Sequence, residues 1–260
     1  MTVPFENDTG NIVRKLARKS LKSEKRRNLM VVIAVALASC LICFSIVMAL
    51  STRQIEKNHV EDTYEAVYTR ITEEDVSTLK GLDDFSRVGE YYMLAVEPAK
   101  QGYNASYIYC DEETMYIARD QMKLLEGRLP QKEDEVAVSR YFLSNYGADA
   151  GIGEKVMLNS ESFHGEYTVT GILEGYKEKE VNGSSILLSK EALKGWSGYD
   201  PADYRAYVHF KNEQQMDETE LTARSREIAK EYQLEMPIMN LSYMKFYKPV
   251  SYTHLTLPTT

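Results

Sequence analysis

"LLEGRLPQKEDEVAVSRYFLSNYGADAGIGEKVMLNSESFHGEYTVTGILEGY", residues 124–176, is the stretch that most constrains the fold. Gly127 and Pro130 predict a turn, because neither residue continues a helix. Gly151 and Gly153 favour a tight turn into a hairpin. The strands predicted in this stretch are Glu135–Ser139, Lys155–Leu158 and Glu166–Leu173, and a short helix is expected over Ser139–Tyr146. Strand, helix and hairpin in this order indicate a mixed fold.

The same alternation of apolar and polar residues predicts strands on both sides of this stretch. They are Arg87–Val96, Ala105–Cys110, Ser185–Leu188 and Tyr204–Phe210. Helices are expected over Thr72–Lys80, Glu112–Leu125, Lys190–Lys194 and Met216–Tyr232, with Thr72 and Ser189 as N-caps. Strands and helices interleave without the regularity of a doubly wound sheet, so the expected class is α+β.

A long apolar run lies near the N-terminus, from Leu29 to Leu50, and contains no charged residue. Its 22 residues would form a helix of roughly 33 Å, enough for a hydrocarbon core of about 30 Å. The alternative is a cleaved signal peptide, with Val47-Met48-Ala49 as the cleavage site. The apolar run and the segment before it are both too long for that. We therefore expect an uncleaved transmembrane helix that continues into Thr52–Glu61.

Charge predicts the orientation of this helix. Residues 1–28 carry eight Lys and Arg against three acidic residues, a net charge of +5, so the whole-chain charge of −8 leaves −13 after Leu50. Basic residues next to a span stay in the cytoplasm. Residues 1–28 are thus expected inside, and residues 51–249 are expected to form an extracytoplasmic domain of the cell membrane. Nothing in this charge pattern indicates nucleic-acid binding.

The basic N-terminal segment also has a helical pattern. Apolar and basic residues between Ile12 and Lys22 fall on opposite halves of a helical wheel. Such a helix lies in the headgroup region of a membrane, so we expect membrane lipids as partners. Within the span, small residues four apart, such as Ala34 and Ala38, favour packing against other membrane helices.

The last stretch, residues 250–260, resembles the translated read-through of a sequencing-library adaptor. We exclude it from the fold and expect the natural protein to continue beyond Pro249.

The order of motifs in residues 124–176 resembles the extracytoplasmic core domain of FtsX-like ABC transporter permeases of the MacB type. That domain carries a Gly-Arg-x-Pro turn, a strand of the form DE-V-hydrophobic-S, an IG-(D/E)-K-V-x-L strand and a V-x-G-I strand. "LARKSLKSEKRRNLMVVIAVALA", residues 16–38, is similar to the basic lead and first span of the same family. The resemblance covers nearly all of residues 10–249.

This resemblance implies a truncated permease subunit whose later spans are missing. It implies two partners, a cytoplasmic ABC-type ATPase and a second permease subunit in a homo- or heterodimer. ATP hydrolysis inside would then move the outer domain for export, extraction or signalling in the envelope. The chain itself has no Gly-x-x-x-x-Gly-Lys-Ser/Thr loop, in agreement with a separate ATPase.

The sequence lacks the residue patterns that would indicate an enzyme. His59, His164 and His209 lack the spacing of a zinc site, and Ser77 with Lys80 matches S-x-x-K without its companion elements. Cys110 is the single cysteine outside the span, so no disulfide framework is proposed. We expect no catalytic, cofactor-binding or metal residues and no cofactor.

Two other classes remain as alternatives. One is the ectodomain of a single-span sensor, which shares the layout of one basic-flanked span and an outer α+β domain. The other is an adhesion or binding module, for which the 19 tyrosines would supply a sticky surface. Most such sensors have a short inner tail, whereas this chain begins with about 28 residues of basic amphipathic lead. Tyrosines at alternate strand positions are more typical of packing, which counts against the binding module.

Overall fold

The computed structural model describes residues 9–98, 102–146, 150–175 and 178–248. The chain divides into two compact units, Met1–Glu56 and Lys57–Thr260. The adaptor-like residues 250–260 lie outside the described residues. The expected domain boundaries, 1–28, 29–50 and 51–249, stay predictions.

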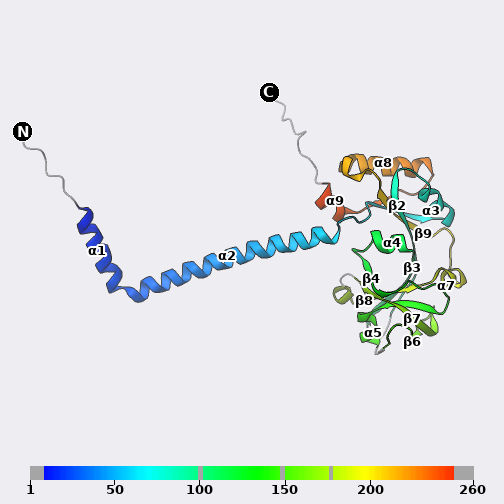
Figure 1. The fold of residues 1–260 in the computed structure, drawn as a ribbon, viewed down its shortest axis with the longest axis horizontal. Coiled ribbons are helices and arrows are strands. Elements are labelled where there is room, and N and C mark those ends of the chain that lie inside the picture. Colours follow the sequence, from blue (N-terminus) through cyan, green and yellow to red (C-terminus); the bar gives the residue numbers. More distant parts are fainter. Residues whose placement is uncertain (1–8, 99–101, 147–149, 176–177, 249–260) are drawn as a thin grey trace, which may run out of the picture. The chain divides into compact units, whose positions relative to one another are not determined.

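The first unit is helical. It contains α1 (Gly10–Ser23) and most of α2 (Lys25–His59), which runs for 35 residues (Figure 1). In the described part of the chain, α2 alone is long and apolar enough to cross a membrane. Within it, the hydroxyls of Ser39 and Ser45 donate to the carbonyl oxygens of Val35 and Leu41, each at 2.8 Å. These side chains thus satisfy their polar groups inside the helix.

The second unit is built on one mixed sheet whose strand order is β10-β1-β9-β2-β3-β8-β5-β7-β4, with β6 also paired to β7. The strands are β1 (Ala66–Ile71), β2 (Phe85–Pro98), β3 (Asn104–Cys110), β4 (Met122–Gly127), β5 (Glu135–Ser139), β6 (Lys155–Asn159), β7 (His164–Gly175), β8 (Gly183–Leu188), β9 (Tyr204–Phe210) and β10 (Ile238–Met239). The helices are α3 (Glu73–Lys80), α4 (Glu112–Ile117), α5 (Arg140–Tyr146), α6 (Glu178–Val181), α7 (Lys190–Gly195), α8 (Glu218–Glu231) and α9 (Leu241–Tyr247), with a 3₁₀ turn at Glu213–Gln215. The expected α+β class is confirmed.

Helices cover the sheet (Figure 1) and enclose one main core and two smaller ones. The main core joins buried side chains of the strands to α3, α5, α7 and α8, represented by Tyr68, Leu79, Phe142, Leu193 and Ile228. Smaller cores form beneath α4, around Ile117 and Cys110. Because α4 covers only part of its face, residues around it remain accessible.

The motifs of residues 124–176 meet at β7. Gly127, at the end of β4, pairs with Gly171 of β7. A Cβ on Gly127 would lie 2.2 Å from the carbonyl oxygen of Thr170, and one on Gly171 would lie 2.6 Å from that of Arg128. Gly127 also has a φ of +83°, which L side chains rarely adopt. Both positions therefore require glycine.

Helix starts follow the sequence closely. Thr72 and Asp75 form the expected capping box of α3. The hydroxyl of Ser189 accepts from the backbone N–H of Ala192 at 3.0 Å and starts α7. Each cap satisfies N–H groups that have no partner within the helix.

One sequence-based expectation is wrong. The helix expected over Glu112–Leu125 ends at Ile117, and Met122–Gly127 forms β4. Pairing of β4 with β7 overrides the helical pattern, because it buries Met122 against the sheet and extends the ladder at its edge.

Apart from β4, the elements with no counterpart in the sequence-based expectations are β1, α6, the 3₁₀ turn at Glu213–Gln215, β10 and α9. The alternation in "EAVYTRI", residues 65–71, is the signal for β1, and Tyr68 in it is fully buried. Tyr92, Tyr107 and Tyr204 are also buried, which confirms that strand tyrosines serve in packing.

Candidate functional site

Three segments far apart in the sequence meet in the second unit. They are the end of α2 with the chain after it (residues 57–65), the turn between α4 and β4 (residues 118–121), and α9 with its N-cap (residues 240–248). We call this meeting point the junction. Its first segment includes the last residues of α2, which belong to the second unit from Lys57 onward, so the contacts of the junction are the first candidates for function.

The end of α2 is fixed by contacts on two sides. His59 Nε2 lies 2.6 Å from the carbonyl oxygen of Asp120, and Val60 is buried. The ammonium of Lys57 lies 5.3 Å from the ring centre of Tyr247, whose hydroxyl is 3.4 Å from the Lys57 carbonyl oxygen. The Arg119 guanidinium donates to the carbonyl oxygen of Glu61. The last turn of α2 is thus part of the domain.

The side chain of Asp120 is a buried titratable group beside this contact. Burial raises the pKa of Asp120 to about 6, and the nearby His59 offsets part of that rise. Its Oδ1 atom has no hydrogen-bond partner among the described residues. A carboxyl group with this pKa changes charge between about pH 5 and pH 7.

A second buried pair lies beside the chain that follows α2. His209 Nδ1 is 2.6 Å from Oε1 of Glu65, which is fully buried, and Glu65 Oε2 accepts from the backbone N–H of Phe210 at 2.7 Å. Burial raises the pKa of Glu65, and the histidine opposes this rise. Burial works against charge on His209, but hydrogen bonding to Glu65 outweighs it and raises the pKa of His209. Each side chain therefore stabilises the charge of the other.

Further hydrogen bonds tie α9 to the same place. The Asn240 side-chain amide donates to the carbonyl oxygen of Tyr64 at 2.9 Å. The hydroxyl of Tyr243 donates to Glu213 at 2.8 Å, and Lys248 Nζ lies 3.1 Å from the same carboxylate. The chain entering the domain and the last described helix are therefore held side by side.

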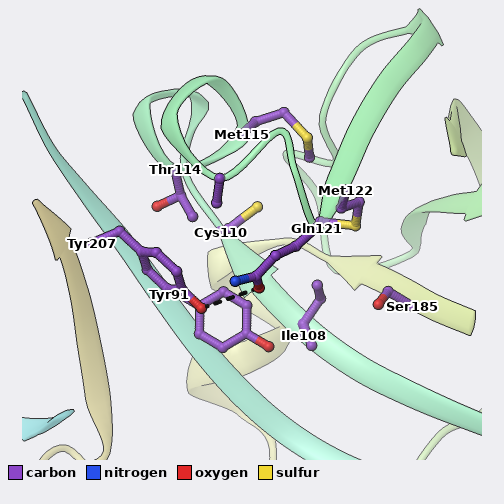
Figure 2. Close-up of a pocket in the computed structure, with 10 residues that line it drawn as sticks. Tyr91, Ile108, Cys110, Thr114, Met115, Gln121, Met122, Ser185 and Tyr207 are labelled. Atoms are coloured by element: carbon purple, nitrogen blue, oxygen red, sulfur yellow. Dashed lines mark hydrogen bonds between the residues drawn. The ribbon is translucent and has the colours of Figure 1, made fainter. Parts of the chain in front are cut away.

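A small cavity of about 60 Å³ lies under α4. Figure 2 shows the sulfur-bearing side chains of Cys110, Met115 and Met122 around it, with Gln121 reaching the hydroxyl of Tyr207. It has room for only a few water molecules. Burial raises the pKa of the Cys110 thiol, so the sulfur stays protonated. Cys110 has the environment of a packing residue rather than of a nucleophile.

A charge network lies where α3, α7 and β2 meet. The Glu90 carboxylate, only 8% exposed, is 2.6 Å from Nζ of Lys190 and 3.7 Å from that of Lys80. Lys80 also pairs with Asp111 at 2.9 Å, and Ser77 is exposed on α3. Lys80 is thus engaged with carboxylates, and the S-x-x-K match has the contacts of an ion-pair network.

The third histidine among the described residues stands apart from these contacts. His59 and His209 belong to the junction, whereas His164 begins β7. Among the described residues, no group of three or more His, Cys, Asp and Glu side chains is arranged to hold a metal.

Comparison with known proteins adds the family. The sequence model of the MacB-like periplasmic core domain matches residues 29–226, from the first residue of the apolar run into α8. No curated protein matches the chain.

Two solved structures have similar folds. The extracellular domain of the ABC-type transporter YknZ from Gram-positive bacteria has 14% identity and a TM-score of 0.48, over 68% of this chain and 100% of that one. The periplasmic region of MacB from Actinobacillus actinomycetemcomitans has 12% identity and a TM-score of 0.46, over 71% of this chain and 91% of that one.

Proposed function

The chain belongs to the MacB-like periplasmic core domain family, and from this premise we propose that it is a permease subunit of an FtsX/MacB-type ABC transporter. This is a family of transporter permease domains, and the apolar helix α2 fits a membrane protein with an extracytoplasmic domain. In the proposal, residues 1–28 are cytoplasmic and the domain lies outside. A partner ATPase drives movement of the domain, and a second permease subunit completes the transporter.

The observation that carries the proposal is the family match over both the span and the domain. It begins at Leu29 and ends at Arg226. A sensor or adhesion ectodomain would give no reason for the first helix to match together with the domain. The family match therefore favours the permease over both alternatives.

The junction suggests how force would enter the domain. Lys57 and His59 belong to the same helix as the apolar run, yet they contact Tyr247 and Asp120 of the domain. A displacement of the end of α2 would have to break these contacts or carry the α4–β4 turn and α9 with it. We infer that the junction transmits movement and that ATP binding and hydrolysis belong to the partner.

The first test is genomic and biochemical. Sequencing past the codon for Pro249 should reveal further hydrophobic segments and a neighbouring ATPase gene. A kinase domain or a stop codon there would contradict the permease. Tagged full-length protein from its native membrane should then copurify with the ATPase and with a second permease subunit.

The second test addresses the junction in the assembled transporter. The double variant His59→Ala/Tyr247→Ala should leave complex formation intact and weaken the coupling between ATP hydrolysis and transport or activation in the envelope. Lys155→Ala is the matched control, because Lys155 is 65% exposed and pairs only with the exposed Glu166 among the described residues. Equal coupling in both variants would contradict a transmitting role for the junction.

A further inference from the structure

A groove of about 430 Å³ lies between α4 and β4, and we call it the α4–β4 groove. Met115, Leu124 and Leu129 line it and pack against the small core behind them. Tyr116 also lines it and is 46% exposed. An apolar side chain from outside could therefore be accommodated here.

The groove differs in charge from the domain that carries it. Arg119, Lys123 and Arg128 line it against a single acid, Glu112, so its lining has a net charge of +2. The residues after Leu50 carry −13, the difference between the whole-chain −8 and the +5 of residues 1–28. A basic groove attracts acidic segments and disfavours basic ones.

The cations are not equally available. Arg128 is held by Glu135, and Arg119 donates to Glu61 and lies 3.6 Å from Asp62. The exposed side chain of Lys123 has no ion-pair partner among the described residues. Lys123 is therefore the cation most open to an incoming carboxylate.

The groove also follows an open sheet edge. In the strand order β4 comes last, and it pairs with β7 along one side only. The backbone N–H and C=O groups on the other side of such a strand are available to another chain. Leu125, at the bulge in this strand, is 39% exposed. Backbone pairing and an apolar groove together are the features that bind an extended peptide.

We propose that the α4–β4 groove binds an extended, acidic segment of a partner protein. The segment adds a strand to β4, places an apolar side chain among Met115, Tyr116 and Leu129, and pairs a carboxylate with Lys123. The backbone edge favours a peptide over a lipid, since a lipid has no N–H and C=O ladder to pair with β4.

The test uses peptides selected on the full chain. A random ten-residue library displayed on phage is selected on the chain in lipid nanodiscs, and enriched peptides are synthesised with a fluorescent label. We expect sequences that combine acidic and apolar residues and that lose binding when a central residue is replaced by proline. Binding measured by anisotropy should fall about tenfold for Lys123→Glu and should weaken with salt.

The matched control is Lys211→Glu, an exposed charge reversal outside the groove that should leave binding unchanged. Several results would overturn the proposal: no enriched peptide, or peptides that bind Lys123→Glu as tightly as the native chain. It would also fail if anionic phosphatidylglycerol vesicles, rather than peptides, lost binding with Lys123→Glu. Dimerisation of the chain that Lys123→Glu abolishes, without peptide binding, would assign the groove to a second copy instead.

Discussion

The guanidinium of Arg128 donates two hydrogen bonds to the carboxylate of Glu135, with N–O distances of 2.8 and 2.6 Å. Arg128 belongs to the Gly-Arg-x-Pro turn and Glu135 begins β5. The same carboxylate accepts from the backbone N–H groups of Gln131 and Lys132 at 2.9 and 3.2 Å. The Gly-Arg-x-Pro turn and the strand that follows it are therefore joined by the Arg128–Glu135 interaction, which closes the turn.

This pair predicts a pH-dependent stability. Hydrogen bonding to Arg128 lowers the pKa of Glu135 from 4.5 to about 2, against a smaller effect of burial. A lowered carboxyl pKa stabilises the fold above about pH 4.5, and that contribution is lost as pH falls toward 2. Since Arg128 is 48% exposed, Glu135→Gln should cost only about 1–2 kcal/mol at pH 7. Urea unfolding of the full chain in detergent measures this cost.

The control for this prediction is Glu166→Gln, which removes a pair whose partners are both more than half exposed. It should change stability by less than about 0.5 kcal/mol. The difference between Glu135→Gln and the native chain should shrink toward pH 2. A difference that is constant from pH 7 to pH 3 would contradict the assignment.

The contact between β4 and β7 predicts a strict need for glycine. Gly127→Ala would place its Cβ 2.2 Å from a backbone oxygen and Gly171→Ala 2.6 Å from another, so each should cost about 2–4 kcal/mol. Gly153→Ala separates clash from backbone strain. Gly153 also has a positive φ, of +86°, but no atom lies within 4 Å of its added Cβ. It should therefore cost only about 1–2 kcal/mol.

Thermal unfolding of the three variants provides the measurement. If Gly153→Ala is as damaging as Gly127→Ala, backbone conformation alone explains the requirement and the close approach to Thr170 does not matter. If Gly171→Ala is neutral, the strands are farther apart than the structure has them.

Where local pattern and pairing agree, the sequence predicts the fold to the residue. Glu135–Ser139 and Tyr204–Phe210 are expected as strands and observed with the same bounds. Both are central strands with several buried residues, so the pattern of burial is strong. Glu112–Leu125 fails because its second half pairs with β7, a contact that no helical periodicity can report.

The junction could not be predicted for a related reason. His59 and Asp120 are 61 positions apart, and the Glu65–His209 pair is separated by more than twice that. A lone histidine carries no signal for its partner in one sequence. The family resemblance, by contrast, depends on the order of local motifs, which survives without knowledge of the contacts.

Asp120 predicts a stability that changes in the opposite direction to that of Glu135. Burial raises its pKa from 3.8 to about 6, so the folded state favours the neutral acid. The stabilisation is present below about pH 4 and lost as pH rises through 6. Asp120→Asn resembles the neutral acid and should stabilise the chain at pH 7.5 by about 1–3 kcal/mol. Urea unfolding should find no gain near pH 4.

Asp83→Asn serves as the control, because the Asp83 side chain is fully exposed and 3.9 Å from Lys211. It should change stability little at either pH. An Asp120→Asn gain of equal size at pH 4 and pH 7.5 would show that the ionised carboxylate is not the source of the effect.

The Glu65–His209 pair predicts non-additive variants. His209→Ala leaves a fully buried carboxylate without its cation and should cost about 2–4 kcal/mol. Glu65→Gln keeps an acceptor for the Phe210 N–H and should cost about 1 kcal/mol. The double variant should be more stable than His209→Ala, because no charge is left unpaired. Costs that simply add in the double-mutant cycle would contradict a coupled pair.

The orientation of the chain can be tested by labelling single cysteines with a membrane-impermeant maleimide in cells. The parent chain carries Cys40→Ala and Cys43→Ala and keeps the buried Cys110, so its own labelling gives the background. The exposed positions Asn11, on the polar half of α1, and Glu161, in the β6–β7 turn, are then replaced by cysteine one at a time.

The eight basic residues before Leu29 should hold the N-terminal side in the cytoplasm. Glu161→Cys should therefore be labelled in intact cells, and Asn11→Cys only after permeabilisation. The reverse result would place the domain inside, where an ATPase could reach it but an envelope partner could not. The proposed permease would then be wrong in its topology, even though the fold and its family would stand.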